Sequence, residues 1–143
     1  MTPYEFDAAI AVRDSGGGLE AEVPDGWDIN GNANGGYILA LGANALRMAC
    51  GRAHPITITA HYLAPVTPGP VTFRTEVVKA GKRLTTMSGS IEREGRTLIR
   101  MLGAFGDLDA SDDQVLNRAA PPDLPPIEQC ERRTPHALLD GRQ

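Results

Sequence analysis

The residues between Asp28 and Arg47 include no charged side chain, and this stretch constrains the fold more than any other part of the sequence. From Gly35 to Cys50 the residues are mostly Ala, Leu, Ile and Met, which favour an α-helix. A helix over these residues would be about 24 Å long and would end at Gly51. Because its apolar side chains cover nearly the whole circumference, we expect it to be buried on all sides, inside something that wraps around it.

Strand patterns lie on both sides of the predicted helix. Before it, Glu5–Val12 and Leu19–Val23 are expected to pair as a hairpin, and a polar loop over Trp27–Asn34 leads into the helix. After it, β-branched residues and alternation predict four strands, over Pro55–Ala64, Val71–Ala80, Leu84–Arg93 and Arg96–Phe105. This order favours an α+β fold in which a curved antiparallel sheet surrounds one long helix.

Composition excludes several classes of function. The chain of 143 residues has a net charge of -4, so we expect no nucleic-acid partner. Cys50 and Cys130 match no metal or redox spacing, and we expect neither a metal nor another cofactor. No apolar run is long enough to span a bilayer, so no membrane partner is expected. With no secretory leader at Met1, we expect a reduced, cytoplasmic protein.

The last part of the chain has a different composition. Asp107, Asp109, Asp112 and Asp113 form an acidic patch, and five of the 11 prolines fall between Pro121 and Pro135. Such a composition does not build a sheet or a core. We therefore expect one domain over residues 1–108 and a linker or loosely docked arm over residues 109–143.

Three segments resemble the hotdog fold, in which a long sheet curls around a central helix. They are "NANGGYILALGANAL" at the helix, "HPITITAHYLAPVTPGP" after it, and "FRTEVVKAGKRLTTMSGSIEREGRTLIRMLGAF" for the last hairpins. Together they resemble the N-terminal hotdog unit of the acyl-CoA thioesterase II type, whose members carry two hotdog units in one chain. The resemblance covers roughly Asp7–Leu108.

The resemblance places an acyl thioester at the start of the central helix and implies a role in fatty-acid metabolism. It assigns Asn34, Gly35 and Gly36 as catalytic, with the amides of Gly35 and Gly36 as free donors to the thioester oxygen. The helix dipole adds partial positive charge there, and glycine lets a carbonyl approach the backbone. The substrate-binding candidates are Asn32, Tyr37, His61, Lys82 and Arg83.

Each candidate also has a structural interpretation. Asn34 is a good N-cap, and the two glycines could serve close packing. Tyr37 fits a tunnel wall or the core, and His61 fits the core or an interface. Asn32 could be an ordinary loop residue, and Lys82 and Arg83 could be solvated turn residues instead of ligands of CoA phosphates.

The water-activating group is not identified by the sequence. The positions where the resemblance places such groups are the Gly35–Gly36 region, Ala43, Pro55 and Gly103, and none has a suitable side chain. Two functions therefore stay open: an acyl-CoA thioesterase-like enzyme, or a noncatalytic acyl-CoA-binding or scaffolding unit. Because one curled sheet leaves an edge and a helix flank uncovered, we expect a homodimer or pairing with another hotdog unit.

Overall fold

A computed structural model of the chain describes residues 4–108, 120 and 122–130. Residues 120 and 122–130 contain one short 3₁₀ helix, η1 (Ile127–Gln129), and are described separately from residues 4–108, which form the fold. Most of the predicted arm and three aspartates of the predicted acidic patch lie outside the described residues.

The long helix α2 (Gly35–Cys50) has the predicted bounds. It begins at the N-cap Asn34 and ends where Gly51 adopts a φ of 67°. This left-handed conformation is available to glycine without a steric penalty, so Gly51 stops the helix.

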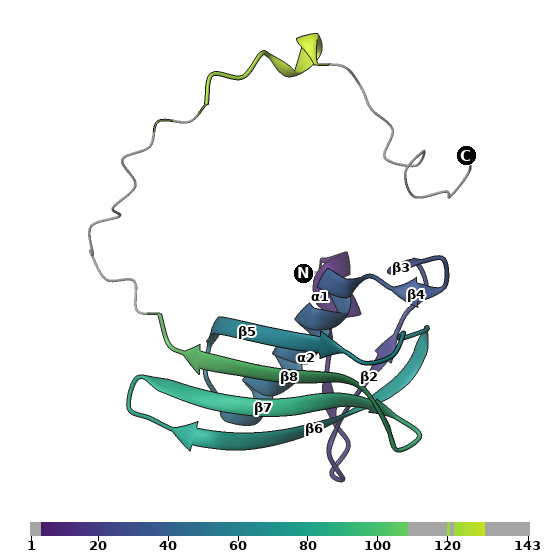
Figure 1. Cartoon of the computed structure of the whole chain (residues 1–143), viewed down its shortest axis with the longest axis vertical. Coiled ribbons are helices and arrows are strands. Elements are labelled where there is room, and N and C mark those ends of the chain that lie inside the picture. Colours follow the sequence, from purple (N-terminus) through teal and green to yellow (C-terminus); the bar gives the residue numbers. More distant parts are fainter. Residues whose placement is uncertain (1–3, 109–119, 121, 131–143) are drawn as a thin grey trace. The chain divides into compact units, whose positions relative to one another are not determined.

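A six-stranded antiparallel sheet curves around α2, as Figure 1 shows. The strands, in spatial order, are β1 (Arg13–Asp14), β2 (Leu19–Val23), β6 (Gly69–Ala80), β7 (Leu84–Arg93), β8 (Arg96–Gly106) and β5 (His54–Tyr62). All five strands that the sequence predicts from Leu19 onward are present, with small differences at their ends. The prediction of a curved sheet around one helix is confirmed, and β5 forms one edge of the sheet.

The prediction of a strand over Glu5–Val12 is wrong, because the structure has a short helix, α1 (Glu5–Ala9), there. Phe6, Ala8, Ile10 and Val12 alternate with other residues and so resemble a strand. Tertiary contacts override this local pattern. The Phe6 ring packs against Trp27 at a centroid distance of 5.4 Å, and Ala9 joins the core.

The segment before α2 is more regular than the predicted polar loop. It forms a two-stranded hairpin of β3 (Asp28–Ile29) and β4 (Asn32–Ala33). Asn30 and Gly31 at its tip have φ angles of 53° and 78°. Two successive positive φ angles at Asn-Gly define a type I′ turn, whose twist suits a tight hairpin. The segment that leads into α2 is therefore a β-hairpin and not an irregular loop.

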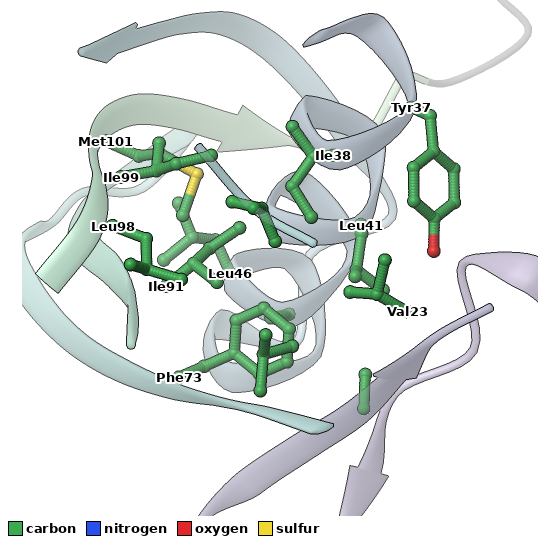
Figure 2. Packing of buried hydrophobic residues seen from close by; sticks show 14 of the residues in the cluster. Val23, Tyr37, Ile38, Leu41, Leu46, Phe73, Ile91, Leu98, Ile99 and Met101 are labelled. Carbon is green, nitrogen blue, oxygen red and sulfur yellow. The ribbon is translucent and has the colours of Figure 1, made fainter. Parts of the chain in front are cut away.

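The core lies between α2 and the concave face of the sheet (Figure 2). Ile38, Leu41 and Leu46 of α2 are buried against strand residues such as Ile91 and Ile99. The expectation that α2 is buried on all sides is wrong in part. Its opposite flank is only half-buried at Leu39, Ala40 and Ala43, and Met48 is 39% exposed. One sheet and the short α1 do not enclose the whole helix.

Candidate active site at the start of the central helix

The start of α2 is capped by the side chain of Asn34. Its Oδ1 atom accepts hydrogen bonds from the Gly36 N–H at 2.9 Å and from the Tyr37 N–H at 3.3 Å. The capping interpretation of Asn34 is therefore correct for this structure. The expectation that the Gly36 amide is free is wrong, because the N-cap satisfies two of the orphan donors of the first turn.

The Gly35 amide is in a different position. None of the hydrogen bonds found among the described residues uses the Gly35 N–H as a donor. Gly35 is exposed, and it is the first residue of α2, where the helix dipole places partial positive charge. The helix start thus offers one unpaired amide donor next to two that are capped by Asn34.

Packing within the chain does not require glycine at position 35. A Cβ atom on Gly35 would lie 3.7 Å from Tyr62 Oη, which is an ordinary contact, whereas one on Gly36 would lie 3.3 Å from Asn34 Oδ1, which is tighter than usual. At Gly42 of the same helix a Cβ would overlap Met101 Sδ. The packing interpretation therefore applies to Gly42 and, more weakly, to Gly36, but it does not explain Gly35.

Tyr62, which the sequence analysis did not select, lies over the helix start. Its hydroxyl donates a hydrogen bond to the Gly35 carbonyl oxygen at 2.8 Å, and its side chain remains 52% exposed. Side chains alternate along β5, and the half-buried Ile58 and Ala60 show which face meets α2. This same alternation, applied to the printed sequence, would have selected Tyr62 in place of His61.

His61 lies on the outer face of the sheet, where Arg100 of β8 is its direct cross-strand neighbour. Both residues are exposed. The structure therefore does not bring His61 to the start of α2 within one chain.

An open depression of about 410 Å³ adjoins the helix start. Asn32 and Tyr62 supply its polar side chains, and the buried Ile38 and Val66 lie at its base. The Ala33 N–H donates to the Val66 carbonyl, which ties the β3–β4 hairpin to the loop that follows β5. The depression combines a mostly apolar lining with polar groups near Gly35, which suits an acyl group with a polar end.

Tyr37 is a core residue in this structure and not a wall of the depression. It is 3% exposed, and its hydroxyl donates to the Ala9 carbonyl at 3.0 Å. Its ring stacks on Trp27 at 5.3 Å, and burial raises the pKa of its hydroxyl. The predicted substrate-binding role of Tyr37 does not fit these contacts, which instead fasten α1 to α2.

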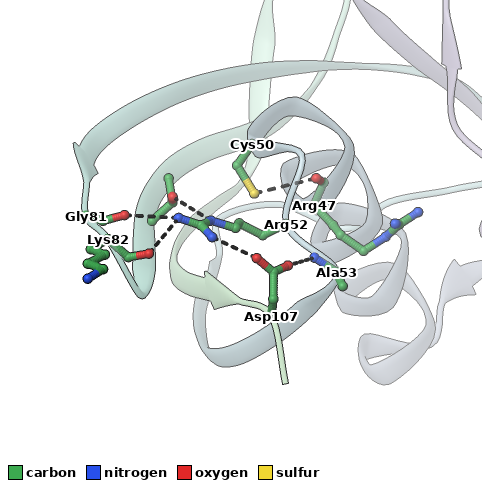
Figure 3. Close-up of polar contacts among 8 residues, drawn as sticks. Arg47, Cys50, Arg52, Ala53, Gly81, Lys82 and Asp107 are labelled. Atoms are coloured by element: carbon green, nitrogen blue, oxygen red, sulfur yellow. Dashed lines mark hydrogen bonds and ion pairs between the residues drawn. The ribbon is translucent and has the colours of Figure 1, made fainter. Parts of the chain in front are cut away.

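Lys82 and Arg83 lie at the other end of α2, about 24 Å along the helix, in the turn between β6 and β7. Their side chains are exposed, and the Lys82 carbonyl accepts a bond from Arg52 (Figure 3). The structure therefore separates these two predicted phosphate ligands from Asn34 and Gly35 within one chain.

Arg52 bonds to several segments near the C-terminal end of α2. Its guanidinium donates to Asp107 at 2.7 Å and to the Gly81 carbonyl at 3.0 Å, as Figure 3 shows. Asp107 also accepts from the Ala53 N–H, and this bond, followed by the bond from Arg52, holds the pKa of Asp107 below its usual range. Asp107 is therefore paired with Arg52 and is not simply part of an acidic surface patch.

None of the hydrogen bonds found among the described residues joins Gly35 to a His, Asp or Glu side chain. Asp28, the nearest acidic residue in the sequence, accepts from the Gly31 N–H at 2.8 Å and the Gly26 N–H at 3.2 Å, and so holds the hairpin. Within residues 4–108, 120 and 122–130, no three His, Cys, Asp or Glu side chains come together as a metal site.

Among the helices of that same part of the chain, none combines the length and the hydropathy that a membrane span needs.

The fold and the helix start agree with a known sequence family. Residues 23–106 match the acyl-CoA thioesterase N-terminal domain, and the chain belongs to this family. The match extends from the end of β2 to the end of β8 and includes the whole candidate site.

Individual relatives agree with this assignment. The chain is 30% identical over 116 residues to Rv0499 of Mycobacterium tuberculosis, an uncharacterized protein, covering 71% of this chain and 40% of that one. It is 29% identical, with a TM-score of 0.81, to a candidate thioesterase II from Thermobifida fusca, covering 94% of this chain and 51% of that one. A protein of hot dog fold from Alicyclobacillus acidocaldarius has a TM-score of 0.77 at 20% identity, covering 93% and 50%.

These comparisons confirm the hotdog fold and the resemblance to the N-terminal unit of thioesterase II proteins. The chain spans about half the length of these solved structures and 40% of the mycobacterial relative.

Proposed function

We propose that this hotdog unit holds an acyl-CoA thioester at the start of α2 and promotes its hydrolysis. The thioester carbonyl oxygen accepts a hydrogen bond from the Gly35 N–H, and the acyl group lies in the depression between Asn32 and Tyr62. Asn34 keeps the first turn of the helix in place through its cap. Family membership supports thioesterase-like chemistry in general, whereas the site residues are part of the proposal.

The reaction follows from where charge develops. A water oxygen adds to the thioester carbonyl carbon, and the carbonyl electrons move onto its oxygen. When this oxyanion collapses, the C–S bond breaks. The oxygen and one hydrogen of the water remain on the acyl group as a carboxylic acid, and its other hydrogen ends on the sulfur as the free thiol of CoA. An amide N–H at a helix N-terminus stabilises negative charge on the oxygen.

One observation carries the proposal. Glycine occupies the exposed first position of α2 although a Cβ atom there would meet nothing closer than 3.7 Å in the chain. Packing against the rest of the chain thus does not require glycine here, and residue 35 has no side chain that could cover its unpaired amide. If packing required this glycine, a Cβ atom on it would overlap a neighbour, as a Cβ atom on Gly42 would overlap Met101 Sδ.

A second candidate function is a noncatalytic acyl-CoA-binding unit. The observation that favours it is the chemistry around Gly35: Asn34 serves as a cap, and Asp28 is held by the hairpin amides. The Asn34 amide is not a base, and both carboxylate oxygens of Asp28 already accept backbone hydrogen bonds. A unit of this kind would bind the thioester and leave water activation to another hotdog unit.

Two measurements on the purified chain separate these functions. Release of free thiol from a panel of acyl-CoAs reports hydrolysis, and titration calorimetry with the same compounds reports binding. Hydrolysis supports the enzyme, and binding without hydrolysis selects the second function. A chain that neither binds nor hydrolyses any acyl-CoA contradicts both.

We also propose that the unit pairs with a second hotdog unit, either another copy or a different one. Strand β5 is an edge whose backbone groups are free to pair, and the half-buried Leu39 and Ala43 line the uncovered flank of α2. His61, Lys82 and Arg83 could then reach a thioester only from the second unit. Light scattering at micromolar concentration tests self-pairing, and Ala43→Glu should shift a dimer toward monomer.

A further inference from the structure

Arg93, the last residue of β7, binds the loop that connects β5 to β6. Its Nε atom donates to the Pro70 carbonyl at 2.9 Å, and its Nη2 atom donates to the Thr67 carbonyl at 2.7 Å. Its Nη1 atom donates to the Thr67 hydroxyl at 2.6 Å. The planar fork of one guanidinium therefore holds three acceptors of this loop at the same time.

The loop has few backbone donors of its own. Pro65, Pro68 and Pro70 have no N–H group. None of the backbone hydrogen bonds found among the described residues is donated by the Val66 or Thr67 amide. The side chain of β7 therefore supplies hydrogen bonds that are missing from the loop itself.

The same loop forms part of the depression proposed for the acyl group. Val66 lies at the base of the depression and is 4% exposed. Its carbonyl accepts a hydrogen bond from the Ala33 N–H at 2.6 Å. Because Asn32 and Ala33 also line the depression, the position of the loop fixes the β3–β4 hairpin and the base together.

We infer that Arg93 is a positioning residue for the acyl group. Arg93 does not line the depression, but it fixes Thr67 and so holds the adjacent Val66 at the base. A lining that is ordered before the ligand arrives saves the ordering cost on binding, and this raises acyl affinity. The inference rests on the proposed function, of which it uses the depression and not the Gly35 amide.

Two ligands that the chain cannot hydrolyse test the inference. CoA has no acyl group, whereas the thioether S-hexyl-CoA carries an alkyl chain that can enter the depression. Titration calorimetry gives the dissociation constant of each. The ratio of the CoA constant to the S-hexyl-CoA constant, here called the alkyl gain, reports how well the depression holds the chain.

The decisive variant is Arg93→Gln, which removes the guanidinium fork and its charge. We expect the alkyl gain to fall by about fivefold, because the loop must then be ordered as the ligand binds. CoA affinity should stay within about twofold of the parent. If the chain hydrolyses hexanoyl-CoA, KM should rise by about the same factor as the alkyl gain falls, at nearly constant kcat. Arg96→Gln is the matched control, because Arg96 is exposed, pairs with Arg93 across the β7–β8 hairpin and loses the same charge.

Hydrogen exchange measured by NMR gives a second result without any ligand. The Ala33 amide donates to the Val66 carbonyl, so it should exchange faster in Arg93→Gln than in Arg96→Gln once the loop is released. If Arg93→Gln does not fold, Arg93→Lys takes its place. Lysine keeps the charge but lacks the fork, so the alkyl gain should again fall.

Other outcomes overturn the inference in distinguishable ways. A folded Arg93 variant with the parent's alkyl gain overturns it and leaves the proposed function intact. An equal loss of affinity for both ligands also overturns it, because Arg93 would then support the fold as a whole. Unchanged exchange of the Ala33 amide removes the link through Val66. A parent chain that binds neither ligand, or gains nothing from the alkyl chain, contradicts the proposed function together with the inference.

Discussion

The side-chain oxygen of Asn34 lies 2.9 Å from the backbone nitrogen of Gly36, so the N-cap occupies an amide that a thioester oxygen could otherwise use. The Gly35 amide, one residue earlier, has no such partner among the described residues. This difference between two adjacent glycines locates the proposed chemistry at Gly35 and leads to a direct test.

Gly35→Pro removes the unpaired N–H with little disturbance to the fold. Proline is favoured at the first position of a helix, and Asn34 before it has φ -56° and ψ 134°, which a residue before proline adopts readily. We expect an unchanged or slightly raised melting temperature and a loss of hydrolysis of about a hundredfold or more. Where only binding is measurable, acyl-CoA should bind more weakly than to the parent. A folded variant with the parent's activity would place the site elsewhere.

Asn34→Ala tests the cap. The substitution leaves the Gly36 and Tyr37 amides without their acceptor, and we expect the free energy of unfolding to fall by about 1 kcal/mol. Asn34→Gly is the matched variant, because glycine at an N-cap costs only about a few tenths of a kcal/mol. Urea denaturation of both chains gives the comparison. An Asn34→Ala chain as stable as the parent would show that the cap contributes little.

Gly42→Ala tests the packing role of the glycine in the middle of α2. Its new Cβ would overlap Met101 Sδ and lie 3.3 Å from Ile91 Cδ1, so the core must shift. The overlap falls on the flexible end of Met101, and alanine is favoured over glycine inside a helix by about 0.5–1 kcal/mol, so we expect a net loss of about 1 kcal/mol in the free energy of unfolding. Gly17→Ala is the control, since a Cβ on Gly17 meets no atom within 4 Å. If both variants kept the parent's stability, the core around Met101 would be looser than its contacts imply.

Asp107→Asn tests the bond to Arg52. The Ala53 amide and Arg52 lower the pKa of Asp107 in the folded chain, so the stabilisation is present above the ordinary carboxyl pKa and is lost as the pH falls through the lowered value. The parent should melt above the variant at neutral pH, and this difference should shrink as the pH falls from about 6 to about 3. Melting curves across that range provide the measurement. A difference independent of pH would mean that the carboxylate charge plays no part.

Removal of residues 111–143 tests the proposed division of the chain. From the proline content of that segment, we expect the shortened chain to melt within a few degrees of the parent and to bind acyl-CoA equally well. Circular dichroism melting and calorimetry report the two properties. A large loss of stability would show that the segment packs on the hotdog unit.

Much of the fold could be predicted from local sequence. The charge-free run and Gly51 define α2, and the turns at Gly81–Arg83 and Glu94–Gly95 bound a strand over Leu84–Arg93 with the observed ends. These patterns work because the periods of helix and strand are properties of the backbone itself. The short helix at Glu5–Ala9 could not be predicted in this way, since Phe6 and Ala9 take their conformation from contacts with distant residues.

The sequence by itself determined the helix, its glycine start and the strands that follow it, because hydrophobic periodicity and turn residues act over a few neighbouring positions. Only the tertiary structure decided that Tyr62 lies over Gly35 and that Lys82 lies at the far end of α2. The contact of Tyr62 with Gly35 joins residues 27 positions apart. Such contacts depend on how the whole sheet curves around the helix, and no local pattern specifies that curvature.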